Sequence, residues 1–135
     1  MDDIFVARVM CSDLTTVAPD ALVEDTARLM LDRGIGSVVV VDGDDQLEGI
    51  LTTTDFVRIV AEREPKDRTP VSAYMATDVV TVGAQVPIKD AADTMIEHGV
   101  HHLPVVDDTA GVIGIVTTTD LTAYLSHVQT PSPGE

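Results

Sequence analysis

Apolar residues along this chain occur in short continuous runs and in longer periodic stretches, and the same succession is found twice. Residues 37–41 read SVVVV and residues 103–106 read LPVV, as expected for buried strands. Ahead of each run, apolar residues recur at spacings of three and four over residues 22–33 and 87–98, which predicts amphipathic helices. The pattern therefore predicts an α+β fold.

The other apolar stretches complete a strand–helix–strand–strand–helix unit in each half of the chain. Turn sequences with Asp and Gly separate the last two strands of each unit, and each last strand leads into a second helix. The expected ranges are 14–17 and 79–82 for the first strands, 47–52 and 112–117 for the last strands, and 56–61 and 121–126 for the second helices.

Single residues at the element ends have expected local roles. Asp20 is expected to cap the first helix, and Pro87 suits the first turn of its counterpart. Gly34 and Gly99 stand just past these helices, where a left-handed residue is usual. Pro104 has no N–H to donate, so its strand is expected at the edge of a sheet.

The two halves are related by an internal repeat with a constant offset of 65 positions, the distance from residue 49 to residue 114. Residues 49–55 read GILTTTD and residues 114–120 read GIVTTTD, and the same offset pairs Met10 with Met75. Self-similarity of this kind indicates one supersecondary unit used twice. Neither half has enough apolar area to be comfortably stable alone, so the repeats are expected to pack as one pseudo-twofold module. We expect residues 1–65 to form the first repeat with a charged linker, 66–128 the second repeat, and 129–135 a flexible tail.

The charge balance limits the classes of partner. The chain has 23 Asp and Glu residues against 8 Lys and Arg, a formal net charge of −15, which argues against nucleic acid or an anionic membrane as a partner. The acidic residues are scattered among periodic apolar segments, so the composition indicates a folded protein from a halophilic archaeon rather than a disordered chain. No apolar run reaches the roughly 18 residues that span a bilayer, and no signal peptide is evident, so the protein is expected to be cytoplasmic.

The repeated phrase has two interpretations. Thr-x-x-Asp before a helix is a capping-box signature, in which the hydroxyl and the carboxylate accept hydrogen bonds from free backbone N–H groups. Each copy also lies where an apolar strand meets a helix N-terminus, a position at which N–H groups and hydroxyls attract phosphate. An Asp one turn into the helix can accept hydrogen bonds from both hydroxyls of a ribose. The spacing therefore also predicts a phosphate end and a ribose end of a nucleotide site in each repeat.

Two copies of an apolar strand ending in Val-Val-Asp, a turn, Gly-Ile-(Leu/Val)-Thr-x-x-Asp and a helix resemble a tandem pair of cystathionine-β-synthase (CBS) domains. The resemblance extends from residue 9 to about residue 128. It implies a module with two clefts, which in this family commonly hold AMP, ADP, ATP or S-adenosyl compounds and regulate attached or partner proteins. It also implies a homodimer, and an adenosine ligand rather than a required cofactor.

The resemblance assigns site residues position by position. The acid that binds the ribose would be Asp55 in one cleft and Asp120 in the other. The remaining positions are the hydroxyls on the phosphate side, the residues that flank the ligand, and the Thr-Val stretches near the adenine. They correspond to Thr52, Thr54, Ile35, Gly36, Ser37, Thr16 and Val17 in the first repeat, and to Thr117, Thr119, Val100, His101, His102, Thr81 and Val82 in the second.

Few cations are available to hold phosphate groups. Arg58 lies one turn after Asp55, whereas Ala123 occupies the equivalent position after Asp120, so the second cleft would rely on His101, His102 and backbone amides. With about one mobile positive charge per cleft, a monophosphate or a sulfonium nucleoside is electrostatically easier to bind than ATP without a metal. The two clefts therefore need not be equally good sites.

Other functions have weaker support in the sequence. His98, His101 and His102 span a helix end, a glycine and a strand start, so their side chains are expected to diverge rather than hold a metal. No nucleophile elbow, P-loop or HExxH helix is present, so the chain is not expected to be an enzyme. The leading expectation is a stand-alone adenosine-ligand sensor that signals to an unidentified protein partner in trans. The alternative is a ligand-free dimerisation and protein-interaction module.

Overall fold

The computed structural model describes residues 4–62 and 69–129, and these residues form two compact units. Most of the expected linker around residues 62–69 and of the tail at 129–135 lies outside the described residues. The first-repeat unit takes in residues 14–62, 69–79 and 108–112, and the second-repeat unit takes in residues 4–13, 80–107 and 113–129. Each unit thus combines most of one repeat with a segment from elsewhere in the chain.

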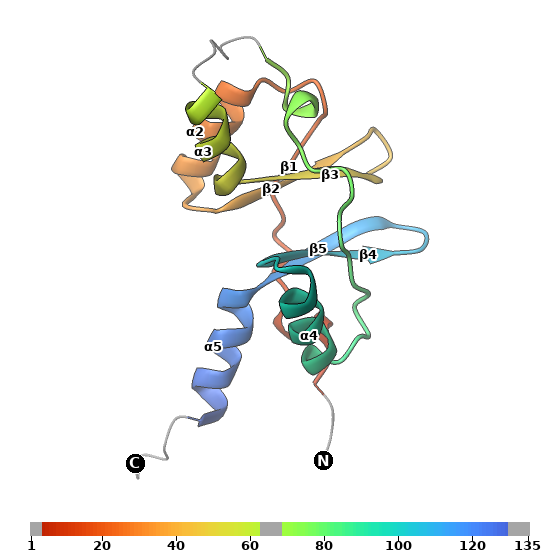
Figure 1. Ribbon diagram of the computed structural model, residues 1–135. Helices are drawn as coiled ribbons and strands as arrows, with labels where there is room; N and C mark the ends of the chain where they lie inside the picture. The colour runs from red at the N-terminus through yellow and green to blue at the C-terminus, as the bar shows by residue number, and fades with distance from the viewer. Residues whose placement is uncertain (1–3, 63–68, 130–135) are drawn as a thin grey trace. The chain divides into compact units, whose positions relative to one another are not determined.

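The first-repeat unit is a three-stranded sheet on which helices α2 and α3 pack (Figure 1). The strands lie in the order β1–β2–β3, with β1 parallel and β3 antiparallel to β2. The elements are β1 (Thr16–Val17), α2 (Val23–Arg33), β2 (Ser37–Val41), β3 (Leu47–Thr52), α3 (Thr53–Glu62) and the 3-10 turn η1 (Val71–Ala73).

The second-repeat unit follows the same plan around a two-stranded sheet, β4–β5. Val82 forms a single parallel bridge with Val105 of β4, at the position that β1 occupies in the first repeat. The elements of this unit are α1 (Val6–Val9), α4 (Ile88–His98), β4 (His102–Asp107), β5 (Gly111–Thr117) and α5 (Thr118–Gln129). Among the described residues, no helix combines the length and the apolar character needed to cross a membrane.

Aliphatic and methionine side chains fill both cores at positions that the repeat relates. Val38 and Val40 of β2, and Leu103 and Val105 of β4, belong to the cores under the helices, while the residues between them, Val39 and Pro104, are also fully buried. The buried residues are Val23, Met30, Val38, Val40, Leu51, Ile59 and Val71 in one core, and Val6, Val82, Ala91, Met95, Leu103, Val105 and Val116 in the other.

Most predicted elements are confirmed within one or two residues, and the local exceptions have physical reasons. Residues 79–82 form only the bridge at Val82 and not a strand. The second helices begin at Thr53 and Thr118, three residues earlier than expected, because the Thr-Thr-Asp segment is itself helical. Asp20 does not cap α2: the N-cap residue is Leu22, without a side-chain bond.

The predictions for the glycines at the helix ends are confirmed, whereas Pro87 is the N-cap residue of α4 rather than part of its first turn. Gly34 and Gly99 are left-handed, with φ of 63° and 64°, and end α2 and α4. Pro104 lies in β4 of the two-stranded sheet, and its carbonyl accepts a hydrogen bond from the N–H of Val82 at 3.1 Å, so β4 has a backbone partner besides β5 at this point.

The segment 4–11, which precedes the first repeat, packs into the second-repeat unit. The Val6 N–H donates to the Val86 carbonyl at 2.8 Å, and the Val6 side chain is fully buried in the core of this unit. Cys11 exchanges two backbone hydrogen bonds with Ile115 of β5, at 2.8 and 3.0 Å. Residues 4–11 therefore belong to the second-repeat unit, although they come before the first repeat in the sequence.

The segment 69–76 makes the equivalent contacts in the first-repeat unit. The Val71 N–H donates to the Ala21 carbonyl at 2.8 Å, and Ala76 exchanges backbone hydrogen bonds with Ile50 of β3 at 2.9 and 3.0 Å. Every residue in these contacts is the repeat counterpart of one in the other unit, 65 positions away. We call residues 4–11 and 69–76 the lead segments, and each packs with the repeat that it does not precede.

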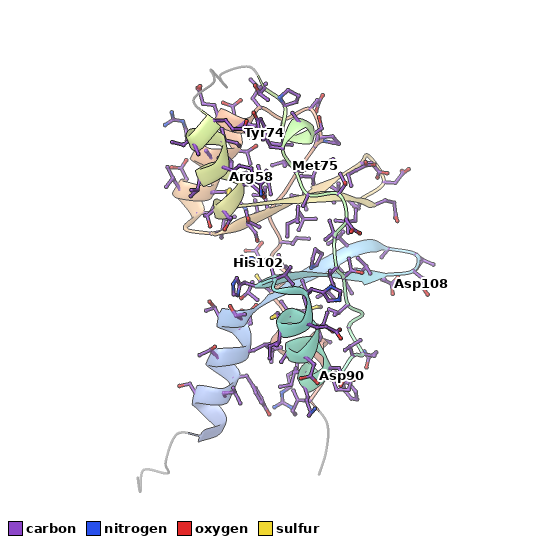
Figure 2. All side chains as sticks on the ribbon, viewed as in Figure 1. Arg58, Tyr74, Met75, Asp90, His102 and Asp108 are labelled. Carbon is purple, nitrogen blue, oxygen red and sulfur yellow. The ribbon has the colours of Figure 1, made fainter. Side chains whose placement is uncertain are left out.

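Two glycines allow the lead segments to approach so closely. A Cβ atom at Gly49 would lie 2.7 Å from the Ala76 carbonyl oxygen and 2.7 Å from the Met75 sulfur. A Cβ atom at Gly114 would lie 2.9 Å from the Cys11 carbonyl oxygen. Figure 2 shows Met75 on the lead segment beside β3. The glycine that opens each copy of the seven-residue phrase is therefore explained by backbone packing.

Candidate functional site

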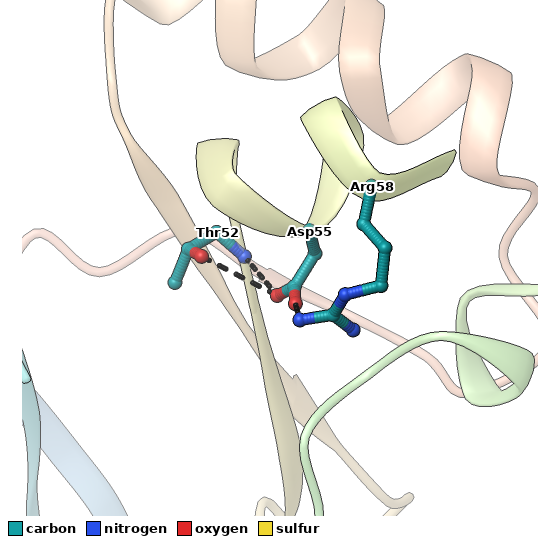
Figure 3. A network of polar contacts seen from close by, with 3 residues as sticks. All are labelled: Thr52, Asp55 and Arg58. Carbon is teal, nitrogen blue, oxygen red and sulfur yellow. Dashed lines mark hydrogen bonds and ion pairs between the residues drawn. The ribbon is translucent and has the colours of Figure 1, made fainter. Parts of the chain in front are cut away.

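In the first repeat, the Thr-Thr-Thr-Asp phrase forms the junction between β3 and α3. The Asp55 side chain bends back toward the strand end: its Oδ2 accepts hydrogen bonds from the Thr52 N–H at 2.9 Å and from the Thr52 hydroxyl at 3.3 Å. Its Oδ1 is ion-paired with Arg58 Nη2 at 3.2 Å (Figure 3). Asp55 is buried, whereas the Arg58 side chain is more than half exposed.

In the second repeat, the same phrase forms a reciprocal cap. The Thr117 N–H donates to Asp120 Oδ2 at 2.9 Å, and the Asp120 N–H donates to the Thr117 hydroxyl at 3.2 Å. These two bonds define a capping box, so the capping interpretation of the phrase is confirmed for this repeat. Asp120 is half-buried and remains partly accessible to solvent.

The two carboxylates differ in their remaining acceptor capacity. Both Asp55 oxygens have a partner, since Oδ1 faces Arg58 and Oδ2 faces Thr52. Asp120 has Ala123 at the position equivalent to Arg58, and its Oδ1 has no hydrogen-bond or ion-pair partner among the described residues. Asp120 can therefore accept further hydrogen bonds through an oxygen that its cap does not use.

Both junctions are joined by backbone to the turn that precedes the central strand. The Thr53 N–H donates to the Gly36 carbonyl at 3.1 Å, and the Thr118 N–H donates to the His101 carbonyl at 3.0 Å. Ser37 is the register partner of Thr52 across β2 and β3. The structure thus brings the predicted flanking residues beside the predicted phrase in each repeat.

The predicted hydroxyls divide into two kinds. Those of Thr52 and Thr117 belong to the caps. Those of Thr54 and Thr119 are on exposed residues and form no hydrogen bond with another described residue. Only the second kind is directly available to a ligand.

Other predicted positions lie further along the sheets. Thr16 and Val17 pair with Val39 and Val40 of β2, on the side away from β3, and Val82 pairs with Val105. The roles of these residues and of Thr81 near an adenine stay predictions. Val100 ends the α4 turn by donating its N–H to the Met95 carbonyl at 3.0 Å.

His102 lies at the start of β4 (Figure 2), within reach of the charge of Asp120. Burial lowers the pKa of His102 from the ordinary value of 6.5, the neighbouring His101 lowers it further, and Asp120 opposes the shift. The imidazole is therefore neutral at pH 7. His101 is exposed, and no group of three metal-ligating side chains occurs among the residues that the structure describes.

An apolar groove of about 440 Å³, which no motif in the sequence predicts, lies between α2 and α3. It reaches the predicted site through Ile35 and Thr53. Its lining positions hold residues of the same kinds in the second repeat, Phe56 for instance matching Leu121. The lining residues are Ala27, Met30, Leu31, Gly34, Ile35, Thr53, Phe56 and Val60.

Comparison with known proteins agrees with the fold and with the motif. The CBS domain model matches residues 6–62 and 71–127. A 17.7 kDa protein of Acidianus ambivalens is 31% identical over 130 residues, which cover 96% of this chain and 78% of that protein. The CBS domain-containing protein YhcV of Bacillus subtilis is 31% identical over 116 residues, which cover 86% of this chain and 81% of that protein.

A solved structure shares the whole fold. The CBS domain pair of protein MJ0100, in complex with 5′-methylthioadenosine and S-adenosyl-L-methionine, matches with a TM-score of 0.87 at 23% identity. The match covers 95% of this chain and 100% of that one. An α+β protein with two such repeats, each with the Thr-x-x-Asp junction, is a tandem CBS pair. The chain belongs to the CBS domain family.

Proposed function

We propose that this CBS pair is a regulatory sensor of an adenosine ligand and not an enzyme. One observation supports the proposal most: the same junction is built twice, with a carboxylate at N3 of a helix, an exposed threonine before it, and a backbone bond to the preceding turn. A cap alone needs only the first threonine and the aspartate. The exposed Thr54 and Thr119 and the backbone-tied turn are extra features that suit a ligand.

The chemistry of the junction fits a nucleoside better than a free anion. A carboxylate accepts hydrogen bonds from a ribose diol, which is a pair of donors in fixed geometry. Capping holds the carboxylate in one orientation in advance, so that binding does not have to order it. The two ligands bound by the MJ0100 pair, 5′-methylthioadenosine and S-adenosyl-L-methionine, are suitable probes for this chain because the two proteins share the fold.

Assembly is the second part of the proposal. Leu31 is 82% exposed in α2, and its repeat counterpart Ile96 is 80% exposed in α4. These exposed apolar residues mark one helix face in each repeat. A second copy of the chain carries the same two faces and is therefore a suitable partner to cover them. We propose a homodimer that buries these faces and passes the ligand signal to a protein partner in trans.

Calorimetric titration tests ligand binding. AMP, ADP, ATP, S-adenosylmethionine and 5′-methylthioadenosine are titrated separately into the full chain, at low and at high KCl. We expect saturable binding of at least one compound. Light scattering of the same samples is expected to give the mass of a dimer, and X-ray scattering a profile that changes with ligand. A folded dimer that binds none of the five would instead support the ligand-free interaction module.

A further inference from the structure

Each repeat uses its aspartate differently, and the difference is local. The Arg58 guanidinium lies 3.2 Å from Asp55 Oδ1, on a carboxylate that is almost fully buried. A ribose that approached Asp55 would have to displace this ion pair. Asp120 has no such partner, and its Oδ1 is free for a pair of hydroxyl donors.

The first turn of α5 has little capacity left for an anion. A helix N-terminus binds phosphate through its unpaired N–H groups. Here the Thr118 N–H donates to the His101 carbonyl, and the Asp120 N–H donates to the Thr117 hydroxyl. The Thr117 N–H, at the cap itself, donates to Asp120. Among the described residues, the Thr119 N–H is therefore the one N–H group of this first turn that forms no hydrogen bond within the protein.

Charge near Asp120 also disfavours phosphate. The Lys and Arg side chains of this unit, within the described part of the chain, are Arg8 and Lys89. Neither is paired with Asp120, and Lys89 lies in the first turn of α4, at the opposite end from His98, where it is paired with Asp93 at 3.3 Å. His102 is neutral at pH 7 because burial lowers its pKa. Within the described residues of this unit, a 5′-phosphate near Asp120 would therefore meet a carboxylate and no Lys or Arg side chain paired with it.

We infer that the two repeats are chemically different sites, and that Asp120 binds the ribose of an adenosine whose 5′ substituent is uncharged or cationic. Asp55 is closed by Arg58 and takes a ligand only when that ion pair opens. The inference rests on the proposed function, and it specifies which repeat binds and which class of adenosine compound it selects.

The experiment uses 5′-methylthioadenosine and AMP as probes of the full chain, by calorimetry at pH 7.5. Asp120→Asn is compared with Asp55→Asn, because the amide oxygen of asparagine can still accept the capping N–H while the charge is lost. We expect Asp120→Asn to weaken 5′-methylthioadenosine binding by about tenfold or more, since a hydrogen bond to a charged acceptor is lost. Asp55→Asn is expected to change it by less than about twofold.

A second pair of variants tests the ion pair directly. Arg58→Met is expected to add a second, weaker binding event for 5′-methylthioadenosine by releasing Asp55. Arg28→Met removes an equal charge from an exposed position on α2 and is expected to leave the titration unchanged. Both variants keep a long aliphatic side chain, so a difference between them reports on the Asp55 contact.

The outcomes separate this inference from the proposed function. Loss of binding in Asp55→Asn but not in Asp120→Asn would overturn it, as would tighter binding of AMP than of 5′-methylthioadenosine, or a single event in Arg58→Met. In each of these cases the wild-type chain still binds an adenosine compound, so the sensor function stands. If the wild-type chain binds neither probe nor any of the other adenosine compounds, the proposed function itself fails.

Discussion

At the scale of single residues, Thr26 is the side chain least suited to its surroundings. It is 1% exposed in α2, and its hydroxyl has no hydrogen-bond partner among the residues that the structure describes. The repeat counterpart is Ala91, which is fully buried and has no polar group to satisfy. A buried hydroxyl without a partner costs about 1–3 kcal/mol relative to one that is hydrogen-bonded.

We therefore expect Thr26→Val to stabilise the protein by about 1 kcal/mol, because valine has the same shape without the polar group. The corresponding rise in melting temperature is roughly 3 °C for a chain of this size. Differential scanning calorimetry measures it. Thr94→Val is the matched control in α4, since the Thr94 hydroxyl donates to the Asp90 carbonyl at 2.9 Å and its loss should not stabilise. Equal effects of both substitutions would contradict the explanation.

At the residue scale, sequence reasoning predicted the capping contact correctly, while the ligand-binding roles stay predictions. The capping box at Thr117 and Asp120 was predicted from their spacing of three, which sequence alone reveals. The pairing of Arg58 with Asp55 was not predicted: Arg58 was expected to face a phosphate group. The bond from the Thr118 N–H to the His101 carbonyl joins elements that are distant along the chain. Local spacing could not predict it, because it depends on how a turn packs against a helix end.

At the scale of elements, the lead segments explain why each phrase begins with glycine. Ala76 pairs with Ile50 beside Gly49, and a methyl group at position 49 would meet the Ala76 carbonyl at 2.7 Å. A backbone carbonyl held in a bridge cannot move away cheaply. The glycine and the segment therefore depend on each other.

Gly49→Ala is expected to lower the free energy of unfolding by about 1–3 kcal/mol, as overpacking of a tight contact does. Gly114→Ala is expected to have a smaller effect of the same sign, because its contact with Cys11 is slightly longer. Gly43→Ala is the control, since its Cβ would meet no atom within 4 Å. Urea unfolding of the three variants gives the comparison. A loss for Gly43→Ala as large as that for Gly49→Ala would mean that close packing is not the cause.

The lead segments also mark the limit of what the sequence could tell about elements. The repeat predicted that Met10 and Met75 are equivalent, and the structure confirms it, since each lies against a glycine of the phrase. The repeat could not tell which unit each lead segment packs in. It shows that the two segments make equivalent contacts, but not with which half of the chain they make them. The helix α1 was not expected either, since four residues without a side-chain cap carry no periodic signal.

At the scale of the whole molecule, the net charge of −15 is the dominant feature. Like charges on a compact chain repel one another and destabilise the folded state more than the expanded one. Salt shortens the range of this repulsion, from about 10 Å at 0.1 M to about 3 Å at 1 M. Exposed ion pairs of the described residues, such as Lys89 with Asp93, contribute little stability that salt could remove.

The melting temperature is therefore expected to rise as KCl is raised from 0.1 to 1 M or above, because repulsion is screened while few favourable pairs are lost. Replacing three exposed acids in one variant, Asp20→Asn, Asp32→Asn and Asp78→Asn, should raise the melting temperature at low salt and flatten its dependence on KCl. Glucose at the same osmolality controls for solvent effects other than screening. If the variant kept the full salt dependence of the wild type, ion-specific hydration or salting-out of apolar surface, rather than charge repulsion, would be its cause. A melting temperature that fell with KCl would show that attractive ion pairs dominate the electrostatics of this acidic chain.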